Sequence, residues 1–288
     1  MEEREKIVRQ LSNYINKMPS LSTTVAKILE ICNDPKTQPA DLNQVISLDP
    51  VLMGKVMRLI NSAYYGMSQE ITSLARAIVM LGLNTVKNLA LSTAVLGKLY
   101  KESQFQAINM EGFWRHSMAV GVIGKHIAKY RNVNAQSEEE YFISGLLHDI
   151  GKIPLNYVFP EKYLMAMGIS DRNQEPIFKS EMKVFPVSHA KVGELIAKAW
   201  NLGEIIKSAI AFHHTPLEYT GKYKDVVYTV CVADYFASFL DIGFSGNRVP
   251  QVPEEELMKH LGISMKILDE IEDSVYNEIE KASVFLSV

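Results

Sequence analysis

Apolar residues recur along most of this chain at the spacing of an amphipathic α-helix, and strict alternation over the length of a β-strand is hard to find. In the first hundred residues these stripes predict helices that begin at or near Thr23, Pro39, Asp49, Ser73 and Thr85. Pro50 suits a first helical turn, where a backbone amide needs no partner. The helix from Thr23 is expected to end before Asn33-Asp34-Pro35. The pattern predicts an all-α fold.

A polar segment at 101–104 separates this first series of helices from a second series. The predicted helices of the second series cover 112–131, 138–150, 187–200, 203–214, 225–241 and 264–284. Loops are expected at 131–137, 170–176, 215–224 and 242–253. We therefore expect one helical unit over 1–105 and another over 106–288. The single apolar stripe of the last helix indicates that this helix closes the core rather than forming a dimer.

Polar residues interrupt the apolar faces of several helices in the second half. His116 shares a stripe with Ala119, Val120, Ile123 and Ile127, which marks it as buried. His189 and His213 lie on similar stripes of their own helices. Asp234 follows a run that is apolar nearly all round, where a carboxylate is costly to bury unless it meets a cation, a metal ion or several donors.

The stretch SGLLHDIGKIP places His148 and Asp149 side by side at a helix end, and His214 follows His213 in the same way. A single inward histidine is usually an ordinary core residue. Four helices that each direct an imidazole or a carboxylate inward favour one shared metal ion, which satisfies all of them. Spacing alone leaves open whether these helices converge. His126 and His260 lie on other faces and are interpreted as ordinary.

Composition and charge exclude several classes of protein. Of the 288 residues 47% are hydrophobic and 22% charged, which is typical of a globular protein, and the net charge of −3 argues against nucleic-acid binding. Short helices at 21–66 resemble a helix-turn-helix, but basic residues there are few. The charged start MEEREKIVRQ indicates no secretory signal, and no run of about 18 apolar residues predicts a membrane span. The two cysteines form no CxxC pair, so we expect a cytoplasmic protein with reduced, non-catalytic thiols.

Two groups of motifs carry a resemblance to known families. HDIGK at 148–152 and VADYFAS at 232–238 resemble the HD superfamily of metal-dependent phosphohydrolases, and the whole histidine pattern resembles its HD-GYP branch. The segments at 18–66 and 71–92 are similar to the HDOD family, the HD-related output domain of bacterial signalling proteins. This second resemblance extends over most of residues 7–240 and is more specific.

The resemblance implies a ligand set for two divalent ions. By the HD-GYP pattern one ion is held by His116, His148, Asp149 and Asp234, and Asp149 bridges to a second held by His189, His213 and His214. Imidazole and carboxylate ligands without a thiolate suit Fe, Mn, Ni or Zn. Such a pair of ions can activate water and clamp a phosphoryl group, with Asp149 and Lys152 as the candidate catalytic residues.

Lys152 has two interpretations. It follows Gly151, the expected terminator of the helix over 138–150, and from there its ammonium is placed to meet a phosphate. Alternatively, it only favours the carbonyl end of that helix.

The sequence departs from both families. HDOD proteins are regulatory modules that have often lost the catalytic residues, whereas this chain keeps them. Thr215-Pro216-Leu217 follows His214 in place of Gly-Tyr-Pro, and Gly112 stands where three-metal members carry a glutamate. These departures argue against cyclic di-GMP hydrolysis and against a third ion.

Three functions remain. The first is a regulatory signalling protein that binds a protein partner and retains a metal centre. The second is a metal-dependent phosphohydrolase acting on a phosphate-containing small molecule such as a nucleotide or cyclic dinucleotide. The third is a redox or oxygen sensor with a diiron centre. The basic groups expected near the ions are few, namely Arg115, Lys152, Lys183 and Lys191, so the sequence favours the first.

Overall fold

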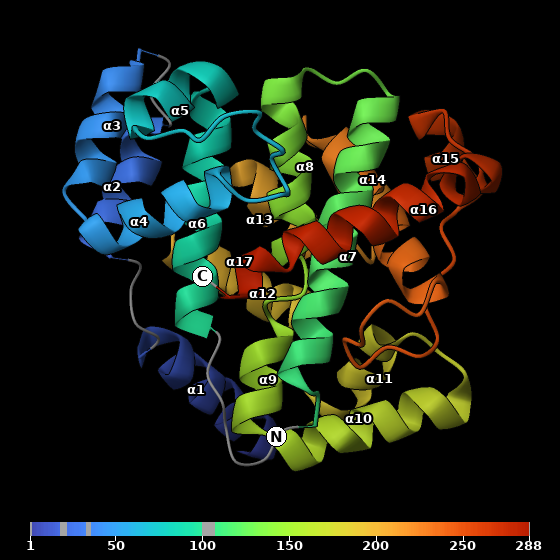
Figure 1. The fold of residues 1–288 in the computed structure, drawn as a ribbon. Helices are drawn as coiled ribbons and strands as arrows, with labels where there is room; N and C mark the ends of the chain where they lie inside the picture. The colour runs from blue at the N-terminus through green and yellow to red at the C-terminus, as the bar shows by residue number, and fades with distance from the viewer. Residues whose placement is uncertain (1, 18–21, 33–35, 100–106, 288) are drawn as a thin grey trace.

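The computed structural model describes residues 2–17, 22–32, 36–99 and 107–287, which form helices and turns with no β-strand (Figure 1). The all-α prediction is confirmed. The helices of the first series are α1 (Glu2–Lys17), α2 (Thr23–Cys32), α3 (Pro39–Ser47), α4 (Pro50–Ile60), α5 (Leu74–Leu81) and α6 (Leu83–Leu99). As predicted, α3 and α4 begin at prolines, and the Asp49 carboxylate accepts a hydrogen bond from the Leu52 amide at 3.0 Å. The predicted end of α2 at Asn33-Asp34-Pro35 lies outside the described residues.

The second series forms the larger part of the molecule. Its helices are α7 (Met110–Tyr130), α8 (Ala135–Leu147), α9 (Lys152–Val158), α10 (Pro160–Asn173), α11 (Ile177–Val184), α12 (His189–Ala199), α13 (Glu204–Phe212), the 3-10 turn η1 (Pro216–Glu218), α14 (Lys224–Phe239), α15 (Glu255–Leu261), α16 (Met265–Ala282) and α17 (Val284–Ser287). In Figure 1, α7 and α8 run through the centre of the fold.

The close crossing of α7 and α8 depends on glycine. A β-carbon on Gly145 of α8 would lie 2.8 Å from the backbone nitrogen and α-carbon of Gly121 of α7. Helix α7 also packs against α14 and α16. Because α7 carries His116 and α8 leads into His148, this crossing brings the two histidines to the same part of the core.

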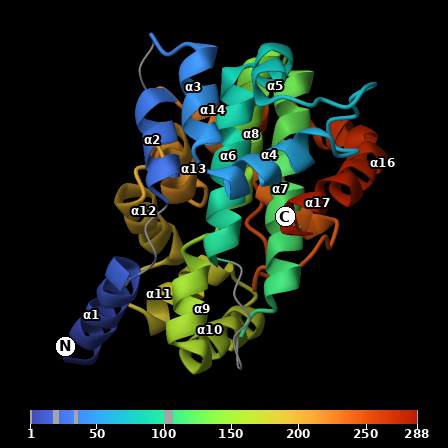
Figure 2. The same cartoon turned by 60° about the vertical axis from the view of Figure 1, so that its left-hand side comes forward.

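Both ends of the chain pack across the two series. Helix α1 contacts α9 and α12, and α17 contacts α6 (Figures 1 and 2). The predicted boundary between 105 and 106 lies outside the described residues, and the division into units over 1–105 and 106–288 stays a prediction. In α16, Leu268, Val275 and Ile279 are buried against the core, as its apolar stripe predicted.

The segment from 148 to 184 differs most from the prediction. The helix predicted over 138–150 ends at Leu147, and three helices that the pattern did not predict, α9, α10 and α11, follow. The loop predicted at 170–176 is shorter, because α10 continues to Asn173 and ends at Gln174 with a φ of 50°.

Gly151 was expected to terminate the helix over 138–150, but it is not the left-handed residue at the end of α8. Its φ is −69°, and it directly precedes α9. A β-carbon at this position would collide with the carbonyl oxygen of His189. The glycine is therefore required for close approach to α12. Lys152 begins α9 and so does not lie at the carbonyl end of a helix.

Replacing Gly151 with alanine is expected to lower the free energy of unfolding by about 1–3 kcal/mol, because the added methyl group must displace the backbone of His189. Gly168 of α10 is the matched control, since no atom lies within 4 Å of a β-carbon added there. Gly168→Ala should instead stabilise the protein by roughly 0.5–1 kcal/mol. Urea denaturation followed by circular dichroism measures both changes, and equal effects would contradict the close approach.

No single helix among the described residues is long and apolar enough to cross a membrane. One pair, α5 with residues 83–96 of α6, has the length and composition together but is bent by 119°.

Candidate metal centre

The structure brings all seven predicted ligands into one buried cluster. They come from α7 (His116), the turn after α8 (His148, Asp149), the first residue of α12 (His189), the end of α13 (His213, His214) and α14 (Asp234). No member is more than 8% exposed. The convergence that the spacing left open is therefore present in the fold.

One part of the cluster contains His116, His148, Asp149 and Asp234. Nε2 of His116 lies 3.0 Å from Oδ1 of Asp234, and Nε2 of His148 lies 3.7 Å from the same oxygen. Nε2 of His148 is also 3.3 Å from Oδ2 of Asp149. One ligand atom each from His116, His148 and Asp149 lie within 4.8 Å of one another, which is close enough to share an ion.

The other part contains Asp149, His189, His213 and His214. Oδ1 of Asp149 lies 3.2 Å from Nε2 of His189 and 3.7 Å from Nε2 of His213. Nε2 of His189 is 3.3 Å from Nε2 of His213 and 3.0 Å from Nε2 of His214. The ligand atoms of all four residues lie within 4.8 Å of one another. Asp149 therefore belongs to both sets, with its two oxygens facing different histidines.

Three of the histidines are anchored through Nδ1. His148 Nδ1 donates to the Gly145 carbonyl at 2.6 Å, and His213 Nδ1 donates to the Ile210 carbonyl at 2.9 Å. His189 Nδ1 donates to Glu181 at 2.7 Å. Whenever these imidazoles are neutral, the remaining nitrogen of each is an acceptor, and the three Nε2 atoms then direct lone pairs at each other and at carboxylate oxygens. Such an arrangement is repulsive unless a cation lies between them.

The electrostatics of the cluster favour ionised aspartates and two neutral histidines, which are the forms that bind a cation. Burial opposes ionisation of Asp149 and Asp234, but the neighbouring histidines, with Lys152 beside Asp149, hold the pKa of each carboxyl well below its ordinary value. Burial lowers the pKa of His213 and His214, which keeps both rings neutral. Burial also disfavours the charged form of His148, but Asp149 and Asp234 raise its pKa to about 10. A cation that binds here displaces that proton.

The residues fit divalent transition-metal ions. Nε2 of His148 and Oδ1 of Asp149 are buried and have no hydrogen-bond partner among the described residues. An imidazole and carboxylate donor set without thiolate suits Fe, Mn, Ni or Zn. The buried histidine and aspartate clusters could thus hold metal. The assignment of particular ligands to two ions stays a prediction.

Sequence reasoning missed a glutamate behind the cluster. Glu181 of α11 is fully buried and accepts hydrogen bonds from both Nδ1 and the backbone amide of His189. Phe178, on the same helix, stacks on the ring of His214 with 4.5 Å between centroids. Neither residue stood on a predicted helix, so no periodicity indicated that either faces the cluster.

Of the predicted basic groups, only Lys152 reaches the cluster. Its ammonium lies 2.7 Å from Oδ2 of Asp149 and donates to the Ser245 hydroxyl at 3.2 Å. The other three pair with carboxylates elsewhere: Arg115 with Glu280, Lys183 with Glu175, and Lys191 with Glu194. His126 pairs with Glu278 and His260 with Asp225, outside the centre, as expected.

Two pockets reach the cluster, and each contacts a different histidine of it. One has a volume of about 200 Å³ and is lined by His116, Ser238, Asp241, Gly243, Phe244, Ser245, Asn247 and Arg248. The other, of about 380 Å³, reaches His214 and includes Phe178, Lys191 and Thr215. In the first, the Arg248 guanidinium is bound to Asp171 at 2.7 Å.

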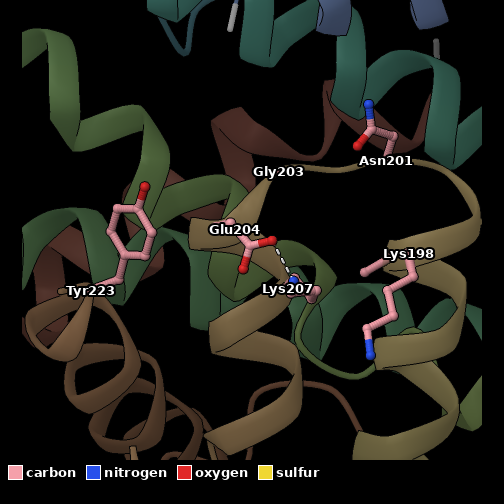
Figure 3. Close-up of a pocket in the computed structure, with 7 residues that line it drawn as sticks. Lys198, Asn201, Gly203, Glu204, Lys207 and Tyr223 are labelled. Atoms are coloured by element: carbon pink, nitrogen blue, oxygen red, sulfur yellow. Dashed lines mark hydrogen bonds and ion pairs between the residues drawn. The ribbon is translucent and has the colours of Figure 1, made fainter. Parts of the chain in front are cut away.

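Figure 3 shows a third pocket, of about 340 Å³, whose labelled residues are Lys198, Asn201, Gly203, Glu204, Lys207 and Tyr223. It lies where α12 ends and α13 begins. At 1.5 Å per residue, this end of α12 is roughly 15 Å from His189 at the other end. Lys207 is paired with Glu204 (Figure 3) and Lys198 with Glu194. This pocket is separate from the candidate metal centre.

Comparisons with known proteins agree with the fold. Residues 18–216 match the HDOD domain. The crystal structure of an HDOD domain protein of unknown function from Geobacter sulfurreducens is 25% identical, with a TM-score of 0.75 over 98% of this chain and 97% of that chain. A Shewanella amazonensis protein with the provisional name of a phosphohydrolase is 22% identical, with a TM-score of 0.72 over 96% and 98% of the two chains; it shares the fold.

An uncharacterised protein of Treponema pallidum is 26% identical over 236 residues, which are 82% of this chain. The match covers 45% of the length of that curated relative. Since the HDOD match covers more than half of the chain, this protein belongs to the HDOD family.

Proposed function

We propose that this protein is a regulatory HDOD protein of bacterial signal transduction that binds two divalent transition-metal ions. The observation that carries the proposal is the buried, converging set of five histidines and two aspartates, with Nδ1 anchored in His148, His189 and His213. The ligands of one ion would be His116, His148, Asp149 and Asp234. The ligands of the other would be Asp149, His189, His213 and His214.

The surroundings of the centre favour a regulatory role over turnover. A catalytic site keeps an open position for substrate, whereas every proposed ligand here is nearly closed to solvent. The pocket at His116 is small, and its arginine is already paired with Asp171. The Lys152 ammonium is 2.7 Å from Asp149, so the carboxylate partly neutralises the charge that Lys152 could offer to a substrate.

A protein partner is part of the same proposal. Large apolar side chains are exposed on helices α4 and α5 and directly after the end of α3, and these three helices pack against one another. They are Leu48 (76% exposed), Val51 (69%), Val79 (78%) and Met80 (54%). Exposed apolar groups on neighbouring helices favour contact with another protein.

The first experiment is the metal content of the purified protein, measured by plasma mass spectrometry. We expect about two transition-metal ions per chain, a lower content in His148→Ala and Asp234→Ala, and an unchanged content in His126→Ala. His126 is the matched control because it pairs with Glu278 outside the cluster. Folded wild-type protein that takes up no ion from Fe, Mn, Ni or Zn would exclude the metal centre.

The alternative function is a metal-dependent phosphohydrolase, with the pocket at His116 as its substrate site. Bound ions would polarise a phosphoryl group and supply a nucleophile from water. The Ser245 hydroxyl and the Arg248 guanidinium line the pocket and would orient an anionic substrate. Lys152, bonded to Ser245, would add positive charge behind it.

Hydrolysis of bis(p-nitrophenyl) phosphate and of cyclic dinucleotides by the ion-loaded protein tests this alternative. Turnover that is lost in Asp149→Asn and reduced in Arg248→Gln would establish an enzyme. Full ion loading without turnover would favour the regulatory function.

A further inference from the structure

Helix α11 presents two side chains to the histidines of the second proposed ion. Phe178 and Glu181 are three residues apart and therefore share a face of the helix. Phe178 stacks on His214 with an interplanar angle of 13°, and Glu181 binds His189. The first proposed ion receives no such contact from α11 among the described residues.

The hydrogen bonds that Glu181 accepts either hold His189 in place or hold the Glu181 side chain itself. Oε2 accepts from His189 Nδ1 at 2.7 Å and from the His189 amide at 2.8 Å. Oε1 accepts from the Tyr163 hydroxyl at 2.7 Å. Tyr163 and Glu181 are both fully buried. Burying a carboxylate is costly, so three converging donors indicate that its position and charge are maintained by the fold.

The contact decides the tautomer of the His189 ring. A carboxylate at Nδ1 requires a proton on that nitrogen, so in the neutral ring Nε2 carries the lone pair. Nε2 faces Asp149 Oδ1 at 3.2 Å and the Nε2 atoms of His213 and His214 at 3.3 and 3.0 Å. Among the described residues both oxygens of Glu181 only accept hydrogen bonds, from Tyr163 and from two donors of His189, which is the pattern of an ionised carboxylate.

We propose that Glu181 is a positioning residue for the second ion: it fixes His189 with Nδ1 protonated and adds a negative charge that strengthens ion binding by Asp149, His189, His213 and His214. This inference rests on the proposed metal centre. Outer carboxylates of this kind contribute roughly 10- to 100-fold to ion affinity. The effect is confined to one of the two ions, because Glu181 contacts none of His116, His148 and Asp234.

Glu181→Gln is the appropriate substitution. The amide oxygen of glutamine can accept both hydrogen bonds from His189, and its NH₂ group can donate to the Tyr163 oxygen. Packing is therefore kept while the charge is removed. Glu175→Gln is the matched control: Glu175 precedes the same helix and accepts from Ser180 at 2.6 Å, but it does not contact a histidine.

The experiment is a titration with Mn²⁺ by isothermal calorimetry, with stoichiometry checked by equilibrium dialysis. We expect Glu181→Gln to bind one ion with wild-type affinity and the other roughly 10- to 100-fold more weakly. Glu175→Gln should match the wild type at both. A second readout is the ¹⁵N chemical shift of His189 at a Zn²⁺ concentration that saturates the wild type, where the wild type should show Nδ1 protonated with Nε2 bound to the ion and Glu181→Gln a smaller ion-bound population.

The outcomes separate this inference from the proposed function. Wild-type protein that binds no Mn²⁺ or Zn²⁺ overturns both. Wild-type protein that binds two ions, with Glu181→Gln unchanged or weakened equally at both, overturns only the role of Glu181. If Glu181→Gln does not fold, Tyr163→Phe decides, because it removes one hydrogen bond to Glu181 and keeps the charge. It should weaken the same single ion by less than roughly tenfold, and no selective weakening would overturn the inference.

Discussion

Asp149→Asn is expected to abolish stoichiometric binding of both ions. Asp149 belongs to both candidate sets: Oδ2 lies 3.3 Å from Nε2 of His148, and Oδ1 lies 3.2 Å from Nε2 of His189. Asparagine keeps one oxygen, carries no charge and places an NH₂ group, which is a donor, where one ion needs an acceptor. Loss of a shared anionic ligand should therefore cost more than the roughly 10- to 100-fold in affinity that an outer contact contributes.

Asp234→Asn provides the contrast. Asp234 contacts His116 and His148 but none of the histidines on α12 and α13. We expect this variant to lose or weaken one ion and to retain the other with wild-type affinity. Equilibrium dialysis with metal analysis measures both variants, and circular dichroism verifies that they are folded. Asp149→Asn protein that retains one ion at wild-type affinity would contradict a bridging role for Asp149.

The sequence predicted which histidines are buried better than it predicted the surroundings of those histidines. His116, His189 and His213 were identifiable because helical periodicity shows which face of a helix is buried, and each is buried in the structure. Their meeting point was not predictable in the same way. It depends on tertiary contacts such as the glycine crossing of α7 and α8, which periodicity within one helix does not describe.

The segment that carries α9, α10 and α11 shows why the rest could not be predicted. Helices α9 and α11 contain seven and eight residues, too few to establish a clear apolar period. Glu181 lies between Ser180 and Met182 with lysines at 179 and 183, so its neighbourhood resembles a solvated helix face. Its burial becomes visible only when α11 is packed beside His189 and His214.

Lys152→Met is expected to destabilise the metal-free protein by about 3–5 kcal/mol, the cost of leaving one partner of a buried ion pair uncompensated. Lys152 is 2% exposed, and its ammonium lies 2.7 Å from the buried carboxylate of Asp149. Methionine fills a similar volume, so the change removes mainly the charge. Lys191→Met is the control, because Lys191 pairs with Glu194 at an exposed position and its loss should cost less than about 1 kcal/mol.

Ions should reverse much of this effect. An ion bound to Asp149 neutralises the carboxylate that Lys152 otherwise compensates, so the destabilisation should shrink in saturating Mn²⁺. By linkage, a ligand that stabilises the folded variant more than the folded wild type must bind the variant more tightly. Urea denaturation in EDTA and in Mn²⁺ measures the stability difference, and calorimetry measures the affinity. The same loss of stability under both conditions would show that no ion binds at Asp149, and Lys152 would then be only a structural partner of that carboxylate.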